Sequence, residues 1–157
     1  MLSIRAATRG DVPLLRTLIR ELAEYERESQ AVLITEEQLR RDGFGLTPKF
    51  RAFIAELDGQ PAGFALFLTS YSTWTGSALF LEDLFVRENF RGHGVGKALI
   101  GQVAEVARKE EHRTIRLDVL DWNESAIRFY KSLGAEYLGQ WSNVVIGNVA
   151  LDRLGRR

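Results

Sequence analysis

The sequence predicts an α/β (α+β) protein in which helices cover a mixed sheet. The order of the predicted elements is the first observation behind this: a strand and helices, three consecutive strands, then alternating helices and strands. Consecutive strands favour an antiparallel meander, and strand–helix–strand units add parallel pairing. The second observation is composition, because 45% of the 157 residues are hydrophobic, enough to bury a sizeable core in one domain.

The N-terminal part of the chain begins with a predicted strand over residues 2–7. The segment that follows has the periodicity of an amphipathic helix, and either Thr8 or Asp11 could cap it. A second, short helix is expected to stop at Gly43. The apolar face of the first helix consists of Leu15, Leu18, Ile19, Leu22 and Ala23.

The middle of the chain predicts three strands, over residues 50–57, 61–71 and 77–86. Asp58 and Gly59 separate the first two strands, and this dipeptide is a strong signal for a two-residue hairpin turn. The third strand is apolar on both faces except at Glu82 and Asp83, which is typical of a central strand.

The last part of the chain alternates between helix and strand. Asn123 can cap the helix that follows the strand over 114–120, and Gly134 suits the position just after that helix ends. No repeat or linker interrupts the chain, so one domain over residues 1–157 is expected. The elements are a helix from 95 to about 112, a strand over 114–120, the helix between Asn123 and Gly134, and strands over 135–141 and 143–154.

Charge and composition exclude several classes of function. The 21 basic residues balance the 21 acidic residues, which gives no support to nucleic acid or an acidic membrane as a partner. The chain has no cysteine, which excludes thiolate nucleophiles and Cys-ligated metals, and His93 and His112 have no metal-site spacing. No signal segment and no run of ~20 apolar residues is present, so a cytoplasmic protein is expected.

Residues 87–101, RENFRGHGVGKALIG, place three glycines between Arg91 and Lys97, after a strand and before a helix. Unpaired N–H groups and the helix dipole make such a turn an anion-binding loop, with a plain tight turn as the alternative. The Walker A pattern fails at Arg91 and at Ala98, and the dinucleotide pattern fails at Lys97. Nucleotide hydrolysis is therefore disfavoured.

The segment from Arg91 to Gly96 has the pattern R-x-x-G-x-G, which resembles the acetyl-CoA pyrophosphate loop of the GNAT superfamily of N-acetyltransferases. The resemblance runs along the whole chain and is strongest to the spermidine/spermine (diamine) acetyltransferase branch. It implies the GNAT fold, with a mixed, mostly antiparallel sheet of about six to seven strands and helices on both faces. The other matching blocks are ELAEYE (21–26), DGFG (42–45), YSTWTG (71–76), FLEDLFV (80–86) and WNESAIRFYKSLGA (122–135).

The resemblance implies direct transfer of an acetyl group from acetyl-CoA to a primary amine of a small molecule, in a ternary complex. Such an amine has a pKa near about 10.4, so a base must remove its proton, and the departing thiolate must gain one. Glu82 is the candidate base, through a water, and Tyr130 is the candidate acid. A solvated edge position for Glu82 and simple core packing for Tyr130 are the alternatives.

The resemblance also implies binding residues and a homodimer. Glu82 and Asp83 point to opposite faces of a regular strand, and the bulge that GNAT proteins have in this strand changes that. The cofactor contacts are Leu84, Phe85, Val86, Arg91, Gly92, His93, Gly94, Val95, Gly96, Lys97, Asn123 and Tyr130. The substrate contacts are Tyr25, Glu26, Trp74, Glu82 and Asp83, with Trp141 as a further candidate.

The acceptor stays open between a diamine, a polyamine, a lysine analogue and an amino acid. Ser125, Ala126, Gln140 and Trp141 depart from the pattern of the polyamine-acetylating branch. A protein N-terminal or lysine acetyltransferase is an alternative that needs an open groove. An acyl-CoA sensor without catalysis is an alternative of another class, and the joint presence of Glu82 and Tyr130 weighs against it.

Overall fold

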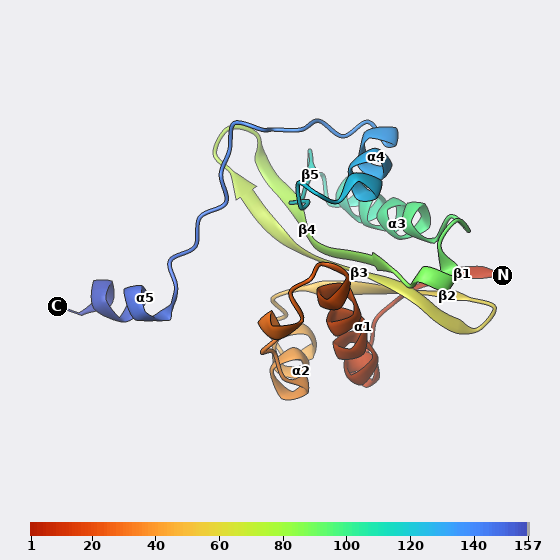
Figure 1. The fold of residues 1–157 in the computed structure, drawn as a ribbon, viewed down its shortest axis with the longest axis horizontal. Helices are drawn as coiled ribbons and strands as arrows, with labels where there is room; N and C mark the ends of the chain where they lie inside the picture. The colour runs from red at the N-terminus through yellow and green to blue at the C-terminus, as the bar shows by residue number, and fades with distance from the viewer. Residues whose placement is uncertain (157) are drawn as a thin grey trace. The chain divides into compact units, whose positions relative to one another are not determined.

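The computed structural model describes residues 1–156, which belong to two compact units, Met1–Leu120 and the segment from Asp121 onward. The first unit contains a five-stranded sheet with the order β1–β2–β3–β4–β5 (Figure 1). Neighbouring strands are antiparallel except β4 and β5, which are parallel, so the mixed, mostly antiparallel sheet is confirmed. The strands are β1 (Leu2–Ala6), β2 (Arg51–Leu57), β3 (Gln60–Ser72), β4 (Gly76–Val86) and β5 (Ile115–Arg116).

Helices cover both faces of this sheet, as predicted (Figure 1). Side chains of β3 alternate between the two faces with the period of a strand. Phe64 packs with Leu15 of α1 on one face, and Phe67 packs with Leu99 of α3 on the other. The helices of this unit are η1 (Arg9–Asp11), α1 (Val12–Tyr25), η2 (Ser29–Ala31), α2 (Glu36–Phe44), η3 (Glu88–Phe90) and α3 (Val95–Lys109).

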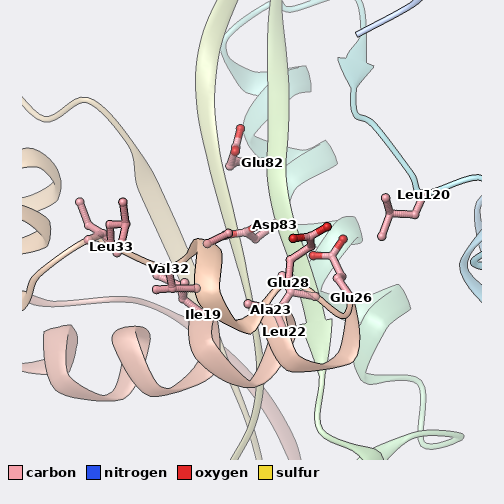
Figure 2. A pocket seen from close by; sticks show the side chains of 12 residues that line it. Ile19, Leu22, Ala23, Glu26, Glu28, Val32, Leu33, Glu82, Asp83 and Leu120 are labelled. Carbon is pink, nitrogen blue, oxygen red and sulfur yellow. The ribbon is translucent and has the colours of Figure 1, made fainter. Parts of the chain in front are cut away.

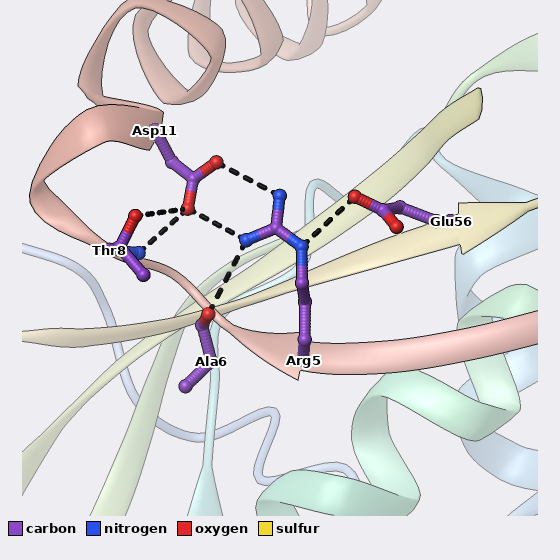
Figure 3. Close-up of polar contacts among 5 residues, drawn as sticks. All are labelled: Arg5, Ala6, Thr8, Asp11 and Glu56. Atoms are coloured by element: carbon purple, nitrogen blue, oxygen red, sulfur yellow. Dashed lines mark hydrogen bonds and ion pairs between the residues drawn. The ribbon is translucent and has the colours of Figure 1, made fainter. Parts of the chain in front are cut away.

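An ion-pair network fixes the start of α1 (Figure 3). The Arg5 guanidinium donates to both carboxylate oxygens of Asp11, at 2.8 and 2.9 Å, and to Glu56 at 2.9 Å. Asp11 also accepts from the backbone N–H of Thr8 at 2.7 Å and is the N-cap of α1. The Arg5 hydrogen bond lowers the pKa of Asp11 to about 2, so the network is ionised at neutral pH.

The predicted hairpin and caps are confirmed. Asp58 (φ 52°) and Gly59 (φ 78°) both adopt the left-handed conformation that a type I′ turn between β2 and β3 requires. In the second unit, the Asn123 side chain accepts from the Ala126 N–H at 3.3 Å and caps α4 (Glu124–Ser132). Gly134 has φ 90° just beyond that helix.

The predicted end of the second helix at Gly43 is wrong, because α2 continues to Phe44 and Gly45 is its C-cap. Gly43 serves packing instead. A Cβ atom at this position would lie 2.3 Å from Cζ of Phe50, so only glycine lets that ring lie against the helix.

The predicted strands over 135–141 and 143–154 are wrong, and the strand over 114–120 shrinks to Ile115–Arg116. The sheet in residues 1–156 therefore has five strands rather than six to seven. The second unit instead has α5 (Asn148–Gly155), and Val144 and Val145 before it are 81% and 83% exposed. β-branched residues favour strands only where a neighbouring strand pairs with them, and residues 135–156 pair with none that the structure describes.

Among the described helices, none combines the length and the apolar character that a membrane span requires.

Candidate active site

The glycine loop joins β4 to α3, and Gly94 is the N-cap of α3. Gly92 (φ 79°) and Gly94 (φ 78°) are both left-handed, a conformation that glycine adopts without the steric penalty of a Cβ atom. Gly94 supplies no side-chain cap, and the first-turn N–H groups of an α-helix have no acceptor within the helix. These amides are therefore available to an anion, and the positive end of the helix dipole favours one.

Some side chains of the loop hold its backbone in place, and others are exposed to solvent. Arg91 Nε donates to the Val86 carbonyl oxygen at 3.0 Å, and His93 Nδ1 lies 2.9 Å from the Arg91 carbonyl oxygen. Val95 is 1% exposed and packs in the core, so its side chain is not available to a ligand. Lys97 is exposed on the first turn of α3. Backbone amides with two cationic side chains nearby fit a diphosphate.

β4 contains the β-bulge that the resemblance implied. Asp83 pairs with Leu66 of β3, but Phe67, the next β3 residue, pairs with Leu81. Glu82 is therefore the extra residue and has no partner on β3.

The bulge changes which β4 side chains share a face. Leu81 before it and Leu84 after it both pack in the core that includes α3, although regular alternation would place them on opposite faces. Phe85 packs in the core that includes α1. Asp83 lies two residues before Phe85 and thus points to the α1 side of the sheet.

The edge of β4 that faces β5 is paired over a short stretch. The ladder consists of Leu79 with Ile115 and Phe80 with Arg116. Beyond Phe80, residues 81–86 have no strand partner on that side within residues 1–156. In this stretch the N–H and C=O groups of Leu84 and Val86 face the open edge, whereas those of Phe85 face β3, as the Arg87 N–H does when it donates to Ala62. Leu84 and Val86 can therefore hydrogen-bond to an extended, amide-containing ligand.

A cavity of about 480 Å³ lies between α1, the segment after it and β4. Figure 2 shows Glu26 and Glu28 at the end of α1 near Asp83, with Glu82 further along the strand. No lysine or arginine is among its lining residues in the described structure. The rest of the lining is apolar and includes Ile19, Leu22, Val32, Ile34 and Leu120.

The carboxylates in this cavity affect one another. Burial, followed by the charges of Glu82 and Glu26, raises the pKa of Asp83 to about 7. Burial and the charge of Glu28 raise the pKa of Glu26. Such groups lower their mutual repulsion by binding a proton or a cation, so the cavity is suited to a cationic ligand with an apolar body.

The way in which α1 ends brings Glu28 into the cavity. Arg27 has φ 62°, its N–H donates to the Glu24 carbonyl at 3.1 Å, and the Glu28 N–H donates to the Ala23 carbonyl at 2.8 Å. This is a Schellman motif with arginine in the position that usually holds glycine. Sequence reasoning missed Glu28 because no glycine marks the turn and a charge-rich helix end is usually solvated.

The predicted aromatic residues have different surroundings. Tyr25 ends α1, and the Arg91 guanidinium lies over its ring, 4.8 Å from the centroid. Trp74 lies in the turn between β3 and β4, is 84% exposed and does not line the cavity. Trp141 belongs to the second unit and is 65% exposed. The substrate roles of all three stay predictions.

Tyr130 and Asn123 both belong to the second unit. Tyr130 lies on α4, is 8% exposed, and its ring meets that of Phe129 edge-on with centroids 5.2 Å apart. Asn123 caps the same helix, and its additional cofactor contact stays a prediction.

Comparisons with known proteins agree on one family. The model of the Acetyltransferase (GNAT) family matches residues 14–135. Thialysine N-epsilon-acetyltransferase of Bos taurus is 47% identical over 143 residues, which cover 86% of this chain and 84% of the relative. Spermidine/spermine N(1)-acetyltransferase-like protein 1 of Homo sapiens is 36% identical over 139 residues, which cover 84% of this chain and 20% of that protein.

A solved structure shows the same fold. The integron cassette protein VCH_CASS6 from the mobile metagenome of V. cholerae superposes with a TM-score of 0.80 at 20% identity, covering 99% of this chain and 98% of that one.

Proposed function

The chain belongs to the GNAT family of acetyltransferases, and we propose that it transfers an acetyl group from acetyl-CoA to a primary amine of a small molecule that carries a second positive charge. It is an enzyme of the diamine acetyltransferase branch. The observation that supports the acceptor class is the cavity, which is lined by Glu26, Glu28, Glu82 and Asp83 without a cationic side chain among its lining residues.

GNAT acetyltransferases use acetyl-CoA as the acyl donor, and when bound it supplies an activated acetyl thioester. The residues that would hold it start with the amides of Gly92 to Lys97, together with the charges of Arg91 and Lys97, for the diphosphate. The backbone of Leu84 and Val86, on either side of Phe85 and facing the open part of the β4 edge, would pair with the pantetheine arm. Asn123 would add a hydrogen bond.

The acceptor would enter the cavity as a cation. Glu26 and Asp83 would bind its distal ammonium group, with Glu28 beside them. The apolar lining suits a methylene or thioether chain between the two amines. An acceptor with a free carboxylate would meet repulsion from these groups, so diamines are favoured over amino acids.

Proton transfer is assigned to two residues. Glu82, exposed at the bulge, would accept the proton of the reacting ammonium through a water, because solvent reaches it and the cavity includes it. Tyr130 would donate the proton that it holds on Oη to the departing sulfur.

We also propose that the two units act as a single GNAT domain, because the family match crosses their boundary at Leu120. The homodimer and the cytoplasmic location belong to the same proposal. The resemblance to the diamine branch supports the homodimer. The absence of cysteine fits the reducing environment of the cytoplasm.

The test follows thiol release from acetyl-CoA in the presence of single acceptors. The panel contains 1,4-diaminobutane, spermidine, thialysine, lysine, butylamine and a short lysine peptide. We expect the fastest release with 1,4-diaminobutane and spermidine, slower release with thialysine and lysine, whose carboxylate the cavity repels, and little with butylamine, which lacks the second charge. Release with the peptide alone would replace this proposal by a protein acetyltransferase. Binding of acetyl-CoA without release by any acceptor would favour a sensor.

A further inference from the structure

One face of α1 is joined to the segment that follows β4 by two arginines. Arg87 pairs with Glu21, and Arg91 lies over Tyr25, so residues four apart on the helix meet residues four apart on the segment. The first contact is a bidentate ion pair between residues 66 positions apart, with Nε and Nη2 each 2.8 Å from a Glu21 carboxylate oxygen.

Arg87 uses its whole guanidinium group for structure. Its third nitrogen, Nη1, donates to the Pro61 carbonyl at 3.1 Å, and its backbone N–H donates to the Ala62 carbonyl at 2.9 Å. One side chain therefore joins α1, the start of β3 and the end of β4. A planar fork with fixed donors holds such a junction more rigidly than a single point charge would.

We propose that Arg87 and Glu21 form a positioning clamp that sets the separation of the two walls of the acidic cavity, and this inference rests on the proposed function. Glu21 lies on α1 five positions before Glu26, and Arg87 lies four positions after Asp83. The clamp thus joins the elements that carry the two facing carboxylates.

The clamp counteracts electrostatic repulsion between the two walls of the cavity. After burial and the charge of Glu82, the charge of Glu26 also raises the pKa of Asp83, so the two carboxylates repel each other when both are ionised. Without a cation between them, this repulsion favours moving α1 away from β4. The Arg87–Glu21 pair opposes that movement and keeps the two carboxylates at a distance that one ammonium group can bridge.

The test compares Glu21→Gln with Glu110→Gln. Glu110 makes a matched bidentate pair with Arg51, at 2.6 and 2.9 Å, which joins β2 to the end of α3 and does not line the cavity. For Glu21→Gln we expect the KM for 1,4-diaminobutane to rise on the order of tenfold, with kcat and acetyl-CoA affinity changed by less than about twofold. For Glu110→Gln we expect an unchanged KM.

A titration tests the clamp without catalysis. Carbon-13 NMR of Asp83 reports the distance between the walls, because burial, followed by the charges of Glu82 and Glu26, raises its pKa, and both the burial and the effect of Glu26 decrease if α1 moves away. In Glu21→Gln, and in Arg87→Lys, which keeps the charge but loses the fork, the pKa of Asp83 should fall toward its ordinary value. Glu24→Gln removes a charge from an exposed site on the same helix and controls for charge alone.

An unchanged Asp83 titration in Glu21→Gln would overturn the clamp, and so would an equal rise in KM in Glu110→Gln. Failure of the proposed function looks different: the wild-type protein would release no thiol, while the NMR titration would still decide about the clamp.

Discussion

The glycine loop and the acidic cavity both adjoin β4, but they use opposite kinds of chemistry. The loop offers main-chain amides of consecutive residues, held by two left-handed glycines at the start of α3. The cavity offers side-chain carboxylates from α1 and β4, which a helix end and a bulge bring together. A backbone site is built by local sequence, whereas a side-chain site depends on how distant elements pack. The two sites should therefore respond to different substitutions.

Tyr130→Phe should have the largest effect while leaving both regions intact. If Tyr130 is the acid, kcat should fall by about 10² to 10⁴, the range for general acid catalysis, with little change in acetyl-CoA or amine binding. Steady-state kinetics and calorimetry measure the two parts. Tyr137→Phe in the same unit is the control. A Tyr130→Phe variant with normal kcat would remove Tyr130 from the mechanism.

Gly94→Val should weaken cofactor binding at the glycine loop and leave the acidic cavity unchanged. Valine is strained at φ 78°, so the substitution would displace the backbone amides at the start of α3 that are available to an anion. We expect acetyl-CoA affinity to fall on the order of a hundredfold, measured by calorimetry. Gly76→Val is the control, because Gly76 is also left-handed (φ 90°) and, like Gly94, has open space at its Cβ position, but lies in the β3–β4 turn at the other end of β4. If both variants lost affinity equally, general destabilisation would explain the result.

The affinity for a diamine should depend on pH through Asp83. Its pKa is raised to about 7, so it is mostly protonated below that pH and becomes a carboxylate above it. Diamine affinity should therefore rise as pH increases through about 7, and Asp83→Asn should lower affinity about tenfold at pH 8 and flatten the profile. Equilibrium binding from pH 6 to 8.5 measures this. An identical profile in Asp83→Asn would contradict the assignment.

Glu28→Gln should change diamine binding in the cavity by the smallest amount among these variants. Glu28 is exposed, so solvent screens its charge, and we expect only about a two- to threefold rise in the KM for 1,4-diaminobutane. Butylamine, which lacks the second charge, should respond less. Glu24→Gln is the matched control, because Glu24 is exposed and does not line the cavity.

The same contrast explains what the sequence could predict. The loop was found because all its parts lie between Arg91 and Lys97, so spacing alone shows them together. A bulge in the strand that contains Glu82 and Asp83 followed from the resemblance and is confirmed, and its position at Glu82 comes from the structure. Glu28 was missed because its place depends on a left-handed Arg27. The predicted strands after Gly134 are wrong, because a strand forms only where another strand pairs with it. The β-propensity of a sequence does not show whether such a neighbour is present.

The central claim is that the amides of residues 92–97 hold the diphosphate of coenzyme A. Calorimetry of the wild-type protein with coenzyme A and with pantetheine, which lacks the diphosphate, tests it most directly. We predict that coenzyme A binds at least about a hundredfold more tightly, and that Gly94→Val removes most of this difference. Equal affinity for the two compounds, or a difference that survives in Gly94→Val, would contradict the claim.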